Sequence, residues 1–138
     1  MTVKNEKFTI STKGFDDLIN ITKKVQDLIT GFNIEDGIAN ITVSASTASL
    51  ITLESEPGLV MDLPKLLDNI VPINKIYKHD NVWYEGNAHA HLKAVLLGNN
   101  LTLPVVSGKI ELNNWQQIVL IDFDNKPRIR QIIVSVTY

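Results

Sequence analysis

The sequence predicts an α+β fold in which antiparallel or mixed strands form a β-sandwich or a partly closed barrel, with helices packed outside. Segments rich in Ile, Val and Thr, which favour strands, occur in the first half and throughout the last third of the chain. Two blocks with apolar residues at helical spacing lie between them. Because helices and strands do not alternate regularly, a doubly wound α/β fold is disfavoured. The expected order is roughly β-α-β-β-α-α-β-β-β.

The first strand is expected at residues 7–12, where apolar and polar side chains alternate. A helix follows, with Asp16 or Asp17 as its cap and Gly31 as its stop. The apolar stripe of this helix consists of Leu18, Ile21, Val25 and Leu28.

The middle of the chain is expected to contain strands and then a second helix. Residues 38–43 and 47–53 form either two strands or one long strand bent near residues 44–46. Residues 59–70 have helical spacing, and Pro64 is expected to kink this helix or split it in two.

A surface loop is expected at residues 73–85, followed by a short helix at residues 87–97 that Gly98 ends. Residues 118–121 are apolar on both faces, which indicates a central strand or one between two layers. The last two strands are expected to pair across a turn at residues 124–127. The closing strands are 101–106, 110–112, 115–123 and 128–138.

Composition excludes several classes of protein. The chain has 138 residues, which is the size of one domain, and a formal net charge of −2. A nucleic-acid binder normally has a basic patch. The one basic cluster, Lys126–Arg130, alternates with apolar residues, so we expect a solvated strand face there. No apolar run approaches a membrane span, and residues 1–7 lack the apolar region of a signal peptide. We expect a cytoplasmic protein without nucleic-acid or membrane partners.

The strongest functional signal comes from the three histidines, His79, His89 and His91, which are close together in the sequence. Histidine carries protons near neutral pH and is a common metal ligand. On a helix, His89 and His91 would point about 200° apart. His91 would then share a face with Asn87, and His89 would share one with Lys93. In an extended segment both imidazoles would point the same way.

A second polar group lies at the bend between the two middle strands. The hydroxyls of Ser46 and Thr47 could bind a phosphate or carboxylate, or could satisfy the bend itself. Glu54 and Glu56 precede Pro57 and could cap the helix that follows. There are no cysteines, and no phosphate-binding Gly-rich loop or dinucleotide fingerprint.

Several short motifs, taken in order, resemble the YjbQ-type family over most of the chain. The resemblance implies one YjbQ-like domain spanning residues 1–138 and a homotrimer of packed β-sheets. Many family members are uncharacterised, and some are called secondary thiamine-phosphate synthases, which join a thiazole phosphate to a pyrimidine methyl diphosphate and release pyrophosphate. The motifs are Asn87–Lys93, Leu96–Gly98, Leu101–Pro104, Gly108–Lys109 and Trp115–Gln116.

The resemblance also implies site residues and shows departures from the family pattern, which include Asn100 in place of a Ser and Asn113–Asn114 in place of Gly-Thr. The family has a histidine where this chain has Ala45, and an Asn where it has Leu53, although Glu54 remains. His79 and His91 match family histidines, whereas position 89 varies in the family, which favours His91 as the site residue.

Three hypotheses follow. In the first, a transferase acts on a phosphorylated small molecule: His91, His79 and Glu54 are catalytic, and the ligand is bound by Asn87, Ser46, Thr47, Lys93 and Gln116. In the second, His79 and His91 hold a divalent metal together with a carboxylate. In the third, the protein is a small-ligand- or metal-binding trimer whose catalysis is impaired because Ala45 replaces the histidine.

Overall fold

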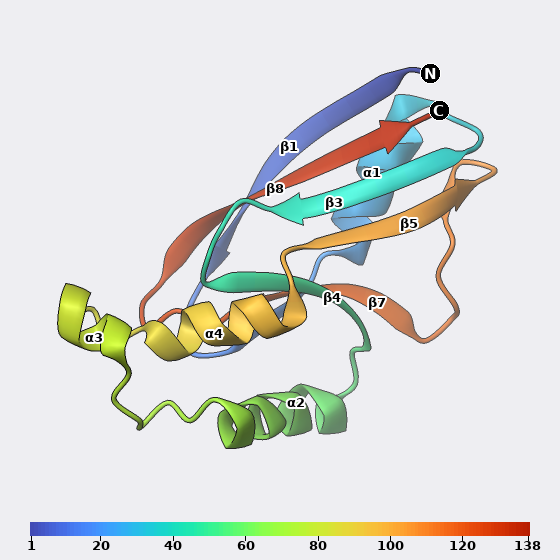
Figure 1. Cartoon of the computed structure of the whole chain (residues 1–138). Helices are drawn as coiled ribbons and strands as arrows, with labels where there is room; N and C mark the ends of the chain where they lie inside the picture. The colour runs from blue at the N-terminus through green and yellow to red at the C-terminus, as the bar shows by residue number, and fades with distance from the viewer.

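The computed structural model describes all 138 residues and confirms the α+β class. Four helices and eight strands follow one another along the chain (Figure 1). The helices are α1 (Thr22–Phe32), α2 (Pro57–Ile70), α3 (Lys78–Trp83) and α4 (Ala88–Leu97). The strands are β1 (Val3–Thr12), β2 (Asp17–Asn20), β3 (Gly37–Val43), β4 (Ala48–Glu54), β5 (Asn100–Val106), β6 (Lys109–Ile110), β7 (Gln116–Asp122) and β8 (Arg128–Thr137).

All strand pairs are antiparallel and form two sheets that together curl into a half-barrel. The larger sheet has the order β1-β8-β3-β5-β6, and the smaller has β2-β7-β4. The register is defined, for example, by Ile41 opposite Val134 in the larger sheet and by Leu50 opposite Leu120 in the smaller one. No helix is long and apolar enough to cross a membrane.

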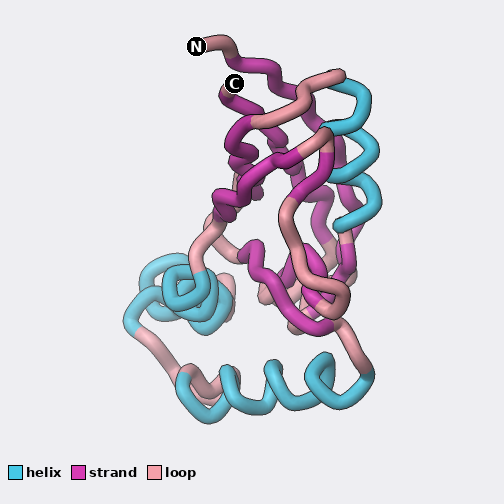
Figure 2. The backbone as a smooth tube through the Cα atoms, turned by 90° about the vertical axis from the view of Figure 1, so that its right-hand side faces the viewer, coloured by secondary structure: helices cyan, strands magenta, loops and turns pink.

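Helices cover the sheets on different sides. In Figure 2, α1 lies on one side of the strands, whereas α3 and α4 lie at the other side and α2 runs along the end of the molecule. The main core joins α1 to both sheets through residues such as Val25, Ile41 and Leu120, and a smaller cluster joins α4 and α2 to β7 through Ala90, Leu67 and others.

Strand β7 contributes to both clusters, as its two apolar faces predict. Ile118 and Leu120 belong to the main core, and Val119 and Ile121 belong to the cluster under α4. The strand is central in its sheet, between β2 and β4. Because successive side chains of a strand point to opposite faces, this strand separates two apolar layers.

The start of α1 differs from the prediction. Residues 17–20 form β2, so Asp16 and Asp17 are not helix caps and Leu18 pairs with Ile121 of β7. The helix starts at Thr22, runs through Gly31 and ends at Phe32, and it is capped by Asn33, whose φ is 55°. Leu18 fits the helical spacing of the following residues only by coincidence. Its conformation is extended because it pairs with the buried strand β7.

The structure decides between the alternatives predicted for the middle of the chain, which concern the two strands and the helix that contains Pro64. Residues 38–43 and 48–54 belong to two strands in different sheets, not to one bent strand. The second helix is continuous from Pro57 to Ile70 with Pro64 inside it, so it is not split. Glu56 starts this helix by accepting hydrogen bonds from the backbone N–H groups of Gly58 and Leu59. Glu54 remains in the strand.

Two further predictions are wrong. The segment 73–85 is not all loop, because residues 78–83 form α3. The last two strands do not pair as a hairpin: β7 lies in the smaller sheet and β8 lies between β1 and β3 in the larger one. The turn after β7 therefore carries the chain from one sheet to the other, and this crossing brings charged residues of both strands together.

Candidate functional site

The structure brings His79 of α3 and His91 of α4 into contact. Their ring centroids lie 4.7 Å apart with an interplanar angle of 63°, an edge-to-face arrangement. Burial lowers the pKa of His91, and the nearby His79 lowers it further because two positive rings would repel each other. His91 is therefore mostly neutral near pH 7.

His91 also lines a cavity of about 340 Å³. Small side chains form most of its wall, and Ser46 and Asn99 supply polar groups. Ala45, which stands where the resemblance implies a histidine, belongs to this wall. Of the predicted site residues, His91 and Ser46 line this cavity. Its lining residues are Ala45, Ser46, Ala48, His91, Ala94, Val95, Gly98 and Asn99.

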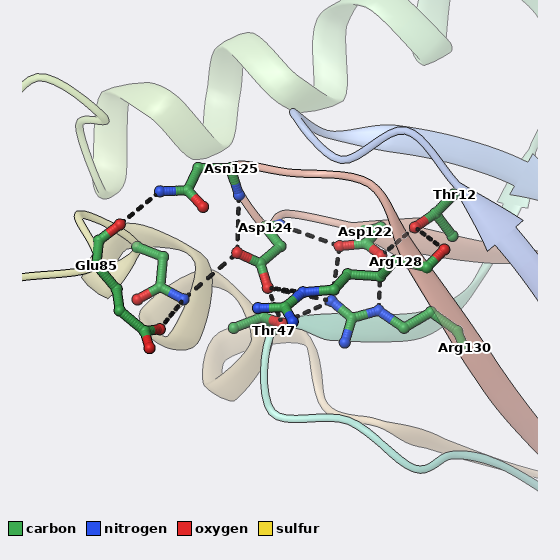
Figure 3. Close-up of polar contacts among 9 residues, drawn as sticks. Thr12, Thr47, Glu85, Asp122, Asp124, Asn125, Arg128 and Arg130 are labelled. Carbon is green, nitrogen blue, oxygen red and sulfur yellow. Dashed lines mark hydrogen bonds and ion pairs between the residues drawn. The ribbon is translucent and has the colours of Figure 1, made fainter. Parts of the chain in front are cut away.

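Thr47, next to Ser46, lies in a buried polar network instead of the cavity wall (Figure 3). Its hydroxyl donates to Asp124 at 3.0 Å and accepts from Arg130 Nη2 at 2.6 Å. Asp124 also accepts from Arg128 Nε at 2.8 Å. Although burial opposes it, hydrogen bonds from the Asn125 backbone and from Arg128 hold the pKa of Asp124 below its usual range. The Thr47 hydroxyl is therefore engaged by protein partners.

Asn87 connects this network to the start of α4. Its Nδ2 lies 3.4 Å from Asp124 Oδ1 and 3.4 Å from Glu85 Oε2. Both distances are long for N–H···O bonds. Asn125 Nδ2 donates to the carbonyl of Glu85 at 2.7 Å (Figure 3) and ties the segment before Asn87 to the turn after β7.

The opposite face of α4 carries His89 and Lys93, as the helical spacing predicts. Lys93 is 1% exposed, and its Nζ lies 3.3 Å from Asp16 Oδ2. His89 is 2% exposed. Burial lowers the pKa of His89, and the positive charge of Lys93 lowers it further, so its imidazole is neutral at pH 7.

Several buried polar atoms around the first turn of α4 have no hydrogen-bond partner. They are both ring nitrogens of His89, Oδ1 of Asn87 and Nε2 of His79. Buried polar groups in folded proteins are nearly always paired. These atoms can be paired only by groups outside the chain, such as ordered water.

Asp80 joins α3 to α4. Its Oδ1 accepts from the backbone N–H of Ala88 at 3.0 Å, and its Oδ2 accepts from that of Tyr77 at 3.1 Å. Although burial opposes it, these backbone hydrogen bonds lower the pKa of Asp80, and so do the nearby His79 and His89 rings. A negative carboxylate at the start of a helix also stabilises the helix.

A family model for UPF0047 proteins of the YjbQ-like type matches residues 6–138. The chain belongs to the YjbQ-like UPF0047 family. A UPF0047 protein of Archaeoglobus fulgidus is 38% identical over 129 residues, which cover 94% of this chain and 98% of that one. A UPF0047 protein of Methanothermobacter thermautotrophicus is 35% identical over 136 residues, or 99% and 93% of the two chains.

Solved structures of YjbQ-like proteins have the same fold. One from Sulfolobus solfataricus, described as a YbjQ-like protein of unknown function, superposes with a TM-score of 0.92 at 32% identity, covering 98% of this chain and 96% of that one. A YjbQ/UPF0047 family protein from Clostridium acetobutylicum gives a TM-score of 0.87 at 32% identity, covering 96% and 99%.

Two residues that the YjbQ-like resemblance implies as site residues lie elsewhere in this chain. Glu54 and Gln116 oppose each other where β4 ends and β7 begins. Glu54 is exposed, and Gln116 Nε2 donates to Thr52 Oγ1 at 3.2 Å. The six residue steps of β4 from Ala48 to Glu54 span roughly 20 Å. The structure therefore does not bring these two residues to His91 within one chain.

No cluster of three or more His, Asp or Glu side chains in this YjbQ-like chain is arranged to hold a metal ion. Of the predicted pair, His79 and His91 contact each other, but no carboxylate completes a three-ligand set with them. The metal hypothesis therefore has two candidate ligands and no preformed third one.

Sequence reasoning missed the charged residues at the turn between β7 and β8. The basic cluster was expected on a solvated face, yet Arg130 is 8% exposed and pairs with Asp122. A signal was present: Asp122 and Asp124 on one side of the turn are spaced by two, as are Arg128 and Arg130 on the other. Charged residues that share a strand face next to an apolar run are candidates for a buried network.

Proposed function

We propose that this chain is a transferase-like enzyme that acts on a phosphorylated small molecule in the cavity beside His91. The proposal is carried by the contact of His79 with His91, which lines a cavity together with Ser46. The Ser46 hydroxyl would donate to a phosphate oxygen, and the ring of His91 would donate to another. His79 would take up or release the proton of His91. General acid–base catalysis of this kind contributes roughly 10²–10⁴-fold.

The most specific form of the proposal is a reaction like that of thiamine-phosphate synthase. Its substrates are a thiazole phosphate and a pyrimidine methyl diphosphate, and pyrophosphate is the leaving group. This specific reaction is supported only by resemblance to family members that are called thiamine-phosphate synthases. Ala45 argues against the reaction, because alanine cannot act as the acid or base that the family's histidine would supply. Glu54, Gln116 and the engaged Thr47 contribute to such a site only if a second copy of the chain or a rearrangement brings them near His91.

Two measurements test this proposal. Titration with inorganic phosphate and pyrophosphate, followed calorimetrically, should detect binding that His91→Ala and Ser46→Ala weaken. Incubation with the two precursors, with product detected by thiochrome fluorescence, should detect thiamine phosphate, and Ala45→His should increase its rate. If the wild-type chain binds neither anion and forms no product, the transferase proposal is wrong.

The alternative is a binding protein with impaired catalysis, favoured by one observation, the alanine at position 45 in the cavity wall. In this alternative the cavity still binds a small ligand, or His79 and His91 bind a divalent metal. Anion binding without product, unchanged by Ala45→His, would support the ligand-binding form. Cobalt(II) titration, with absorption bands that disappear in His79→Ala, would support the metal-binding form.

We also propose that the chain forms a homotrimer through an exposed apolar surface next to the cavity. Monomeric proteins rarely expose contiguous apolar patches beyond a few hundred Å². Val95 is 79% exposed and also lines the cavity, so this surface reaches the site. The exposed large apolar side chains from α2 to α4, which we call the α2–α4 apolar surface, are Leu59, Met61, Leu66, Ile70, Ile73, Ile76, Val82, Trp83, Tyr84, Leu92, Val95 and Leu96.

A further inference from the structure

The free edge of β1 is the starting observation. This strand is the last one of the larger sheet and pairs only with β8. Thr2 and Tyr138 exchange both of their backbone hydrogen bonds, at 2.8 and 3.0 Å. Because such pairs alternate along an antiparallel ladder, the even-numbered residues of β1 bond to β8, and the odd-numbered ones direct their N–H and C=O groups outward. An exposed row of unpaired backbone groups is a template for another strand.

Charged side chains usually keep such an edge from pairing. Residues 3–7 of β1 are exposed and include Lys4, Glu6 and Lys7. The carboxylate of Glu6 takes part in no ion pair of the chain. Lys4 Nζ donates to the carbonyl of Phe32 at 2.7 Å, but an ammonium group has three donors. Both Lys4 and Glu6 can therefore bind a group of opposite charge, and they share one face of the strand.

The signs of these charges fit a second copy of β1. Two copies would pair antiparallel about a two-fold axis, with outward-directed residues opposite each other. Each register is then centred on one residue, which lies opposite its own copy. Centring on Lys4, Glu6 or Lys7 places like charges directly opposite each other, which is destabilising. Centring on Asn5 places Lys4 of each copy opposite Glu6 of the other.

Registers centred further along the strand are closed off. Centring on Phe8 would place Val3 of one copy opposite Lys13 of the other. The backbone N–H of Lys13 already donates to Asp17 Oδ2 at 2.8 Å, so the Asp17 side chain occupies that end of the edge. The open part of the edge is therefore the charged first half of β1.

We propose that β1 pairs antiparallel with β1 of a second copy of this chain, in the register centred on Asn5. About six backbone hydrogen bonds would form, all from the outward-directed groups of Val3, Asn5 and Lys7. An ion pair between Lys4 and Glu6 lies on each side of the axis.

This contact is separate from the proposed function and from the proposed trimer. In both views the first half of β1 lies at the end of the molecule away from α2 (Figures 1 and 2). Edge pairing therefore leaves the α2–α4 apolar surface uncovered, and the chain has two different surfaces for contact with its own copies.

The edge contact is weak because only residues 3–7 of each β1 overlap, which is far less than a standard interface. We expect it to be mostly dissociated at about 10 μM and well populated at about 1 mM protein. Sedimentation at about 10 μM therefore reports on the proposed trimer alone.

Cysteine cross-linking tests the register, since the chain has no cysteine of its own. At the two-fold axis the two Asn5 Cα atoms would lie about 5.5 Å apart, within reach of a disulfide. Asn5→Cys should therefore form a disulfide-linked dimer under mild oxidation at about 1 mM protein. Thr9→Cys is the matched control: it is also exposed and outward-directed, but its two copies would lie about 27 Å apart. We expect it to cross-link at least about tenfold more slowly.

Exchange of the two charges tests the ion pairs. In the Asn5→Cys chain, either Lys4→Glu or Glu6→Lys places like charges opposite each other and should slow cross-linking by about tenfold. The double variant Lys4→Glu, Glu6→Lys restores opposite charges and should regain most of the rate. Because a fold defect from one substitution would persist in the double variant, recovery separates pairing from folding.

Amide hydrogen exchange tests the pairing in the wild-type chain. The N–H groups of Val3, Asn5 and Lys7 should exchange more slowly at about 1 mM than at about 10 μM protein, because pairing covers them. Those of Lys4 and Glu6, which already bond to β8, are the internal control and should not depend on concentration.

The inference is overturned if Asn5→Cys cross-links no faster than Thr9→Cys, or if the double charge variant does not recover. Outward N–H groups whose exchange is independent of concentration would overturn it as well. None of these results bears on anion binding at His91, so the proposed function is tested separately.

Discussion

Asp122 and Arg130 form a two-point ion pair that joins the two sheets. Arg130 Nε lies 2.6 Å from Asp122 Oδ2, and Nη2 lies 2.8 Å from Oδ1. Asp122 ends β7 in the smaller sheet, and Arg130 belongs to β8 in the larger one. Thr12 of β1 donates to the same carboxylate. The pair therefore links the end of β7 to β8 across the two sheets (Figure 3).

Arg130→Met should destabilise the protein by about 3–5 kcal/mol, because it leaves Asp122 charged and buried without its partner. Urea unfolding at pH 7 measures the change. Arg128→Met is the matched control: its side chain is 35% exposed, so a smaller loss is expected. Equal losses in the two variants would contradict the special role of Arg130.

Local patterns predicted much of the fold, and long-range pairing explains most of what they missed. The double apolar face of residues 118–121 correctly indicated a central strand. The same residues could not reveal that β7 and β8 lie in different sheets, because a short turn is equally compatible with a hairpin. Leu18 is a similar case, since its helical spacing was overruled by pairing with Ile121.

The candidate site was predictable where it depended on helix geometry. The spacing in α4 correctly placed His89 with Lys93 on one face, and the structure brings His91 to His79 and to the cavity with Ser46. The spacing of apolar residues could not reveal α3, because a six-residue helix has too little periodicity to be recognised. The hydrogen bond from the Ala88 N–H at the start of α4 to Asp80 of α3 was therefore not predictable. The engagement of Thr47 by Arg130 likewise depends on which sheets meet.

Gly14→Ala should destabilise the protein by about 2 kcal/mol or more, because the new side chain is strained at positive φ. Gly14 has φ of 76°, and a Cβ there would lie 2.5 Å from the carbonyl oxygen of Asp124 and 2.7 Å from that of Lys126. Thermal or urea unfolding measures the effect.

Gly31→Ala is the control for this prediction. Gly31 lies in α1, and a Cβ added there would have no neighbouring atom within 4 Å, so alanine should stabilise the helix by about 0.5–1 kcal/mol. If both substitutions change stability in the same direction, the left-handed conformation of Gly14 is not the constraint that the structure indicates.

Stability should decrease as the pH is lowered below about 6.5, the unfolded pKa of histidine. Burial lowers the pKa of both His89 and His91 in the folded chain. The unfolded chain therefore binds more protons in this range, and the free energy of unfolding rises with pH until the unfolded histidines are neutral. Above that pH their contribution is constant.

Urea unfolding at pH 5.0 and pH 7.5 measures this dependence. His89→Gln should flatten it, because glutamine does not titrate. Asp80 and Asp124 have lowered pKa values, so their stabilising effect is lost only at more acidic pH and does not account for a change near pH 6. An unchanged pH dependence in both His89→Gln and His91→Gln would show that these two histidines are not its cause.

Val95→Asp should dissociate the proposed trimer, because it places a charge in the α2–α4 apolar surface. Val95 is 79% exposed on α4 and is surrounded on that face by Leu92 and Leu96, both exposed. Burying an unpaired carboxylate in an interface is strongly unfavourable, so the variant should remain folded and sediment as a monomer. Ile129→Asp is the matched control, since Ile129 is 75% exposed on β8, outside this surface, and its variant should sediment like wild type. A wild-type chain that sediments as a monomer, or a Val95→Asp chain that remains trimeric, would exclude this surface as the interface.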